Sequence, residues 1–316
     1  MATTFQTPPV PVTPAPGRPA SGPAVGGGRD LGGQVLNVFS HGFLVTWALL
    51  VILPLGWAVM SSFKTDAEIV RDPIGPPSGL HWENFSTAWT TGHIGDLFFN
   101  TIVVMAGGVF LTMLFGAMAA YVLARYEFPG NKLIYYSFVA GLTLPIFLAI
   151  VPLYQVVANL GNSVRWLGLN QYPMLVLVYV AYSLPFTVFF LHSFFRSLPT
   201  AIAEAAIVDG ASHTRLFFQV MVPLAKPGLI SIGIFNIIGQ WNQWLLPTVL
   251  MQAQGGGEEK RAMLAQGLID LQVNQGYQGD YGALFAGMTM AMLPILVVYV
   301  SFQRQVQAGL TGATLK

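Results

Sequence analysis

The sequence predicts an all-α polytopic membrane protein with six transmembrane helices, and three observations support this fold class. First, 54% of the 316 residues are hydrophobic and only 9% are charged, whereas soluble domains carry roughly 25% charged residues. Second, six apolar runs reach the length of about 20 residues that a bilayer requires. These runs are residues 41–61, 97–124, 133–157, 172–195, 228–251 and 281–302. Third, none of them contains Asp, Glu, Lys or Arg, each of which costs about 2.5–3.5 kcal/mol at the bilayer centre.

The prolines inside these runs also favour a membrane environment. Five of the six runs contain proline, at Pro54, Pro145, Pro152, Pro185, Pro247 and Pro294. Soluble helices seldom accept so many, whereas membrane helices do because neighbouring helices satisfy the freed carbonyl groups. We therefore expect residues 36–316 to form one six-helix transmembrane domain.

Residues 1–35 have a different composition. Seven prolines fall between Pro8 and Pro23, and three consecutive glycines follow at residues 26–28. Such a segment has almost no side chains that could pack, so we expect a disordered tail. It lacks a charged start followed directly by an apolar core, so we expect no cleavable signal peptide.

The loop charges predict the orientation of the chain. With the N-terminus inside the cell, the inner segments hold nine of the fourteen basic residues and four of the thirteen acidic ones. The excess of Lys and Arg near the inner ends of the spans places both termini, and the tail, in the cytoplasm.

Composition and motifs exclude several function classes. The chain has no cysteine, which excludes disulfides, thiolate metal sites and a cysteine nucleophile. A net charge of +1 without a basic run gives no indication of nucleic-acid binding. No Gly-Lys pair occurs, so the chain has no phosphate-binding P-loop. No nucleophile–base pair or cluster of metal ligands stands out, and we expect no catalytic residue and no metal.

The polar segment 197–227 separates the fourth and fifth runs. Good helix formers from Thr200 to Asp209 follow Pro199, which suits the first position of a helix, and Gly210 is expected to end that helix. A second short helical pattern runs from Ser212 to Met221, and Pro223 is expected to end it. By itself this pattern is also typical of an ordinary polar hairpin.

The spacing within this segment resembles the EAA loop of binding-protein-dependent ABC import permeases. Glu204-Ala205-Ala206 is followed after three residues by Gly210, and after nine more by Val220-Met221-Val222-Pro223, where the family has Ile-x-Leu-Pro. The resemblance implies a coupling helix that docks into a groove of a separate ATPase subunit. The residues that it assigns to coupling are Glu204, Ala205, Ala206, Asp209, Gly210 and Pro223.

Further motifs are similar to those of the carbohydrate branch of this family, of the maltose type. They are the Ser-Phe-Lys-Thr of residues 62–65, the segment 81–85, Asn100-Thr101, the W-N-x-W-x-x-P of residues 241–247, and the C-terminal segment 303–313. The sequence departs from the family by shortening the end of the tail. The resemblance covers about residues 61–316.

This resemblance implies a function and a set of partners. The chain would be the non-catalytic permease of an ATP-driven importer in the bacterial plasma membrane, carrying a sugar or oligosaccharide. Its partners would be a second permease, two ATPase subunits that bind ATP and Mg, an extracytoplasmic sugar-binding protein and membrane lipid. Two alternatives stay open: an importer for a polyol or a glycerol-phosphate-like solute, and an ion-coupled secondary transporter. The second is disfavoured because such transporters usually carry ionisable residues inside the membrane.

Uncharged side chains in the fifth run are candidates for the substrate path. Asn236, Gln240 and Gln243 are spaced i, i+4 and i+7, which places them on one face of a helix, and Trp244 lies beside that face. Amides suit sugar hydroxyl groups because they both donate and accept hydrogen bonds, and an indole ring can stack on a sugar ring. Alternatively the amides hold helices together, at about 0.6 kcal/mol each.

Two other pairs of polar residues are considered for a functional role. Gln155 and Asn159 in the third run are secondary candidates for the substrate path. His192 and His213 are expected to be ordinary surface residues.

Overall fold

The computed structural model describes residues 31–252, 261–269 and 280–312, and the described residues contain helices and connecting segments but no strand. The chain divides into two compact units, residues 1–53 and 54–316. The first helix, α1 (Leu31–Ser61), begins in the first unit and ends in the second. It starts ahead of the predicted boundary at residue 36. The remainder of the predicted tail, residues 1–30, lies outside the described residues.

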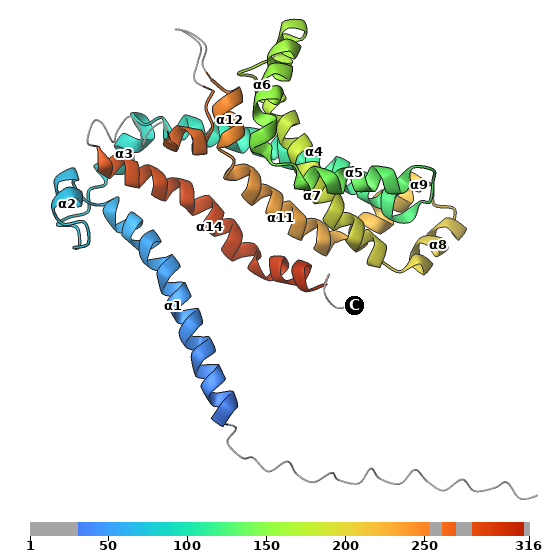
Figure 1. Cartoon of the computed structure of the whole chain (residues 1–316), viewed down its shortest axis with the longest axis horizontal. Helices are drawn as coiled ribbons and strands as arrows, with labels where there is room; N and C mark the ends of the chain where they lie inside the picture. Colours follow the sequence, from blue (N-terminus) through green and yellow to red (C-terminus); the bar gives the residue numbers. More distant parts are fainter. Residues whose placement is uncertain (1–30, 253–260, 270–279, 313–316) are drawn as a thin grey trace, which may run out of the picture. The chain divides into compact units, whose positions relative to one another are not determined.

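The second unit holds the other helices of the described chain (Figure 1). The long ones are α4 (Ile94–Arg125), α5 (Asn131–Thr143), α6 (Ile146–Ser163), α7 (Tyr172–Ser197), α11 (Lys226–Trp241) and α14 (Tyr281–Gly312). The short ones are α2 (Asp66–Arg71), α3 (Glu83–Thr90), α8 (Thr200–Val208), α9 (His213–Arg215), α10 (Val222–Leu224) and α12 (Leu245–Leu250), with a further helical turn over residues 264–269. A 3₁₀ turn, η1, covers Arg165–Leu167, and a π-helical turn, η2, covers Leu216–Met221.

The most extensive helix packing in this unit is between α4 and α7. α11 packs against both, α14 packs on α11, and α5 packs on α7 (Figure 1). Along α4, the small residues Gly108, Thr112 and Gly116 are spaced four apart. A Cβ atom at Gly116 would collide with the Thr187 side chain of α7, and one at Gly108 would touch Tyr179. Small residues at this spacing let membrane helices approach closely, which explains why α4 and α7 form the centre.

Three apolar clusters fill the spaces between these helices. One joins the ends of α4 and α7 to the loop 197–227, through residues that include Tyr121, Phe195, Phe217 and Met221. A second packs α3, the start of α4, Trp241 and the start of α14 together. A third joins α4, α6, α7 and α12. The loop 197–227 is therefore built onto the same core as the long helices.

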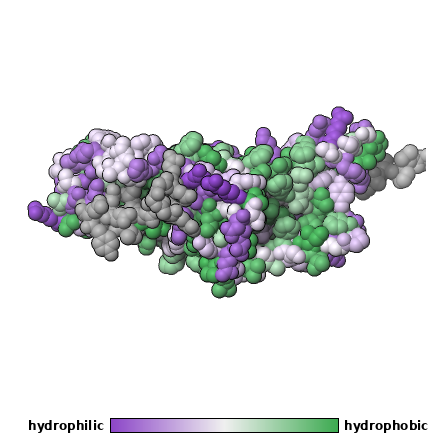
Figure 2. Space-filling view, turned by 90° about the horizontal axis from the view of Figure 1, so that it is seen from above, coloured by the Kyte–Doolittle hydropathy of each residue, from purple (hydrophilic) through white to green (hydrophobic). Residues whose placement is uncertain are grey.

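The described helices supply five of the six expected membrane spans directly, and a sixth only if two helices joined at a bend are counted as one. Five described helices are long and apolar enough to cross a bilayer: residues 36–61, 94–125, 146–163, 172–197 and 281–305. A sixth span is reached only if His213–Leu224 and Lys226–Trp241, which meet at a bend of 78°, are counted as one. Lys226–Trp241 alone rises about 24 Å. On the face seen in Figure 2, hydrophobic side chains are exposed over wide areas, with hydrophilic side chains between them.

Two predicted spans are broken rather than continuous. The third is divided at Leu144, whose backbone is extended (ψ 116°), because a following proline disfavours the helical conformation. The fifth is divided after Trp241, with α12 beginning at Leu245. Pro54, Pro185 and Pro294, by contrast, lie inside continuous helices.

Candidate functional site

The first half of the loop 197–227 folds as the sequence predicts. α8 covers Thr200–Val208, and Pro199 stands just before it, at the N-cap. After α8, Gly210 adopts a φ of +81°. Its N–H bonds to the Ile207 carbonyl at 3.0 Å, and the N–H of Ala211 bonds to the Ala206 carbonyl at 2.9 Å. This is the Schellman arrangement, in which a glycine in the left-handed region ends a helix, so the predicted stop at Gly210 is confirmed.

The second half of the loop differs from the prediction. Helical structure begins at His213 after the N-cap Ser212, but it widens into the π turn η2 and continues through Pro223 to Leu224. The expectation that Pro223 ends the helix is wrong. In a regular helix the ring of a proline clashes with the carbonyl four residues earlier, and the wider π turn ahead of Pro223 relieves that clash.

α8 presents apolar and acidic side chains on its surface. None of its residues is buried, and Glu204 and Ala205 are exposed. Ile202 and Ile207 are also exposed, and Val208 is 86% exposed. Only Ala203 and Ala206 pack partly against the core beneath the loop. Of the predicted coupling residues, Glu204, Ala205, Asp209 and Gly210 are exposed and lie together in and just after α8, while Ala206 faces inward.

Two of the predicted substrate-path amides point into the helix packing. Asn236 and Gln240 are each 4% exposed. The Asn236 amide donates to the hydroxyl of Thr187 at 2.9 Å, and the Gln240 amide donates to the hydroxyl of Ser183 at 3.2 Å. In this conformation both amides tie α11 to α7.

The Gln240 side chain also reaches α4. A Cβ atom at Gly108 would collide with the Gln240 side-chain oxygen. Among the described residues this oxygen is buried without a hydrogen-bond partner, as is the hydroxyl of Thr112 one turn further along α4. Gly108 thus leaves the space that the Gln240 amide fills.

The other two path candidates lie beyond the end of α11. Because α11 ends at Trp241, Gln243 does not continue the face of Asn236 and Gln240, and that expectation is wrong for Gln243. Its side-chain oxygen instead accepts a hydrogen bond from the N–H of Leu245 at 3.2 Å, at the start of α12. Trp244 stands at the same break and is 43% exposed.

The structure also places the secondary path candidates, Gln155 and Asn159, and the two histidines that were expected at the surface, His192 and His213. Gln155 and Asn159 are exposed on α6. His192 is not a surface residue: it is buried and lies against the ring of Tyr135, with centroids 4.2 Å apart. His213 is exposed but shares a hydrogen bond of 2.9 Å with the hydroxyl of Tyr126 at the end of α4. No local sequence pattern marks either contact, because the partners are distant along the chain.

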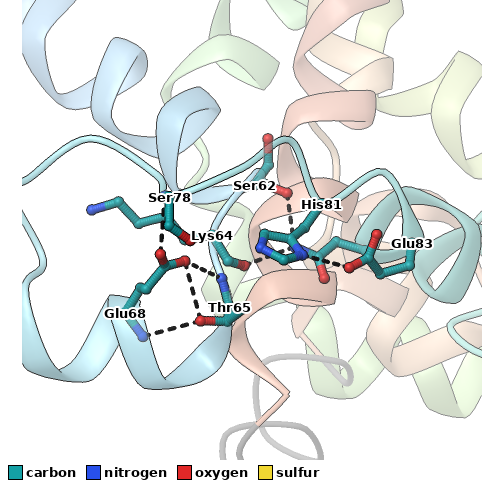
Figure 3. Close-up of polar contacts among 8 residues, drawn as sticks. Ser62, Lys64, Thr65, Glu68, Ser78, His81 and Glu83 are labelled. Carbon is teal, nitrogen blue, oxygen red and sulfur yellow. Dashed lines mark hydrogen bonds and ion pairs between the residues drawn. The ribbon is translucent and has the colours of Figure 1, made fainter.

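Two motifs that are separate in the sequence meet between α1 and α4 (Figure 3). The side-chain amide of Asn84 donates to the carbonyls of Ser62 and Lys64, each at 2.9 Å. The rings of Phe63, Trp82 and Phe85 pack together with centroids 5.0–5.7 Å apart. Residues 62–65 and 81–85 therefore pack together and close the segment between them, and we call this segment with its two ends the 61–84 knot.

Lys64 lies at the centre of this knot with a side chain that is 0% exposed. Its ammonium group donates to the backbone carbonyls of Asp72 at 3.0 Å and Pro73 at 3.1 Å. The Pro73 carbonyl also accepts a hydrogen bond from the Trp57 indole at 2.6 Å. The buried charge is thus compensated by carbonyl dipoles, and it closes the turn after α2.

Glu68 closes the other side of the knot (Figure 3). Its carboxylate accepts hydrogen bonds from the N–H of Thr65 at 2.8 Å and the N–H of Ser78 at 3.0 Å. The side chain of Ser78, followed by these N–H groups, lowers the pKa of Glu68 from its usual 4.5 to about 2. The carboxylate is therefore the form that holds the knot.

Comparisons with known proteins identify the family. Residues 85–312 match the family described as "Binding-protein-dependent transport system inner membrane component". The chain is 47% identical over 277 residues to the diacetylchitobiose uptake system permease protein NgcG of Streptomyces coelicolor, with 88% of each chain covered. It is 32% identical to the trehalose transport system permease protein SugB of Mycobacterium tuberculosis, covering 85% of this chain and 97% of the relative.

A solved structure shares the fold. A bacterial ABC transporter involved in the import of the acidic polysaccharide alginate aligns with a TM-score of 0.73 at 20% identity, over 86% of this chain and 96% of that one. With these matches and the helical architecture above, the chain belongs to the binding-protein-dependent transport family, as a multi-pass permease subunit of a sugar ABC importer.

Proposed function

We propose that this permease is driven by a separate ATPase subunit that docks on α8. α8 carries the proposal, because its exposed Ile202, Ile207 and Val208 lie beside the exposed Glu204. An apolar surface with a charge at its edge is typical of a protein interface. Glu204, Ala205, Ala206, Asp209, Gly210 and Pro223 are its proposed coupling residues. ATP and Mg bind to the ATPase, and this chain binds no cofactor and catalyses no reaction.

The same proposal includes the orientation of the chain in the membrane and its remaining partners. The loop 197–227 and both termini face the cytoplasm of a bacterial plasma membrane, as the excess of basic residues in those segments favours. A second permease completes the membrane pore, and an extracytoplasmic binding protein delivers the sugar from the opposite side. The 61–84 knot then lies on the outer side of the membrane.

We propose that the cargo is a disaccharide of N-acetylated amino sugars. The support is the 47% identity, over 88% of both chains, to a permease named for diacetylchitobiose uptake. Such a cargo is uncharged, and the described parts of the long apolar helices offer it amide, hydroxyl and aromatic groups.

Within the path, Trp244 is the proposed contact with the sugar. Its ring is 43% exposed at the break between α11 and α12, where it can stack on a sugar face. Gln243 orders that break through its bond to Leu245. Asn236 and Gln240 hold α11 against α7 and α4 in this conformation, and we propose that they reach cargo only after α11 moves away from these helices.

The experiment is uptake of labelled diacetylchitobiose by a host strain that lacks this chain. We expect uptake to be lost, to return with the wild-type gene, and to be competed by unlabelled diacetylchitobiose but not by glycerol 3-phosphate. Trp244→Ala should slow uptake, whereas Trp166→Ala, at another exposed tryptophan, should not. Normal uptake in the deletion strain, or competition by glycerol 3-phosphate alone, would overturn the proposed cargo.

A further inference from the structure

The last turn of α4 contacts the loop 197–227 before α8. The guanidinium of Arg125 donates from Nη2 to the carbonyl of Leu198 at 2.6 Å. Leu198 is the C-cap of α7, where the carbonyl groups at the end of a helix lack partners within it. A cation at this position is favoured by the helix dipole as well as by the hydrogen bond. Arg125 therefore fastens the first arm of the loop to α4.

The C-cap residue of α4, Tyr126, contacts the loop after α8. The hydroxyl of Tyr126 and Nδ1 of His213 are 2.9 Å apart, and the two rings meet edge to face at 5.7 Å. His213 is the first residue of α9. The last residue of α4 and its C-cap thus hold the two segments that lead into and out of α8.

The α4 end of these contacts is itself held in place. The side-chain amide of Asn131 donates to the carbonyl of Tyr126 at 2.7 Å and to that of Leu123 at 3.1 Å, which caps α4. The chain turns back to make this cap at Gly130, whose φ is +89°. Beneath Tyr126, the ring of Tyr121 packs against both Tyr126 and Phe217 of η2. The attachment point is therefore part of the packed core.

We propose that Arg125 and Tyr126 are positioning residues for energy coupling, because they fasten both arms of the loop to α4 and make α8 move with α4. We call the contacts of Arg125 with Leu198 and of Tyr126 with His213 the clasp. The inference rests on the proposed docking of an ATPase on α8.

The packing explains why such a clasp is needed. The loop on either side of α8 packs on the core, but α8 itself has no buried residue and only Ala203 and Ala206 pack partly there, so apolar contacts alone resist its movement weakly when a partner pulls on it. The clasp transfers that pull to α4, and α4 passes it to α7 through the close helix contact at Gly108 and Gly116. When the contacts of the clasp are broken, ATP-driven movement of α8 bends the loop 197–227 and does not move the membrane spans.

A distance measurement tests the clasp without knowledge of the cargo. The chain has no cysteine, so spin labels can be attached at Phe110→Cys on α4 and Ala201→Cys on α8, both exposed positions. In the full complex, we expect one narrow distance distribution that is the same with and without ATP. The double variant Arg125→Gln with Tyr126→Phe should broaden this distance distribution and make it change when ATP is added.

The matched control is Arg215→Gln with Tyr136→Phe, at an arginine that bonds to Gln219 and an exposed tyrosine of α5. A distribution as narrow in the clasp variant as in the control would overturn the proposal.

A second measurement separates coupling from folding and from docking. Tyr126→Phe keeps the ring and removes only the hydroxyl. At equal amounts of assembled complex, we expect the sugar transported per ATP hydrolysed to fall about tenfold, the factor that roughly one hydrogen bond is worth in an equilibrium. His213→Phe should give a similar loss, and the double variant should lose no more than either single one. An unchanged ratio, or additive losses, would contradict the clasp. A wild-type complex without any ATPase subunit would refute the proposed function instead.

Discussion

At the scale of single residues, Lys64 shows how a buried charge can organise a loop. Its ammonium group is held by the backbone carbonyls of Asp72 and Pro73, and no carboxylate of the described chain forms a salt bridge with it. Burying an unpaired ammonium is costly, but carbonyl acceptors that would otherwise be unsatisfied offset that cost. Lys64 therefore serves the local fold of the 61–84 knot.

We expect Lys64→Met to destabilise the protein by about 1–3 kcal/mol, because it leaves buried carbonyl groups without a donor. The matched control is Lys132→Met at an exposed lysine at the start of α5, where a change within about 0.5 kcal/mol is expected. The thermal melting midpoint of the detergent-solubilised protein measures both. Equal midpoints for the two variants would show that the Lys64 contacts contribute nothing.

Glu68 gives the same knot a dependence on pH. Its pKa in the folded protein, about 2, lies below the usual 4.5, so the unfolded chain binds a proton more readily than the folded one. The stabilisation is present above pH 4.5 and is lost as the pH falls through about 2. We expect Glu68→Gln to lower the melting midpoint at neutral pH, and the difference from wild type to shrink as the pH falls from about 4.5 towards 2. A difference that does not change with pH would show that the charge of Glu68 is not the cause.

At the scale of helices, Trp241 links two irregular points in neighbouring spans. It is the last residue of α11, immediately before the break that precedes α12. Its indole N–H donates to the carbonyl of Ala291 at 3.2 Å, three residues before Pro294 inside α14. A proline weakens the hydrogen bonding of the preceding turn, so an outside donor is favourable there. The W-N-x-W-x-x-P motif thus has a structural role at Trp241 and an exposed ring at Trp244.

We expect Trp241→Phe to cost about 0.5–1.5 kcal/mol, since it removes the hydrogen bond while an aromatic ring remains against Phe98, whose centroid is 5.4 Å away. Trp166→Phe, at an exposed tryptophan, serves as the control and should leave the melting midpoint unchanged. If Trp241→Phe has the same melting midpoint as the control, the hydrogen bond from the indole N–H does not stabilise the packing of α11 on α14.

At the scale of the whole molecule, the apolar runs predicted five of the membrane-spanning helices and the place of the loop 197–227, because the burial of apolar residues in lipid depends mainly on local composition. The continuity of the spans could not be predicted in this way. Pro145 accompanies a break while Pro185 and Pro294 do not, since the outcome depends on which neighbours satisfy the freed carbonyl groups.

The candidate site was predictable to a similar degree. The helix at Thr200–Val208 and its stop at Gly210 follow from local propensity and turn geometry. The break after Trp241, which separates Gln243 from Asn236 and Gln240, and the contact between Tyr126 and His213 depend on residues that are remote in sequence. No local pattern marks such contacts.

The central claim is that α8 receives an ATPase subunit, and Glu204→Lys tests it most directly. The tagged wild-type chain is purified from membranes of its host and the ATPase subunit that accompanies it is quantified, beside Glu204→Lys and the matched exposed control Glu127→Lys. Reversing a charge in an interface costs several kcal/mol, so we expect the bound ATPase to fall at least about tenfold in Glu204→Lys only, with normal amounts of the permease in the membrane. Wild-type amounts of ATPase bound to Glu204→Lys would contradict the account.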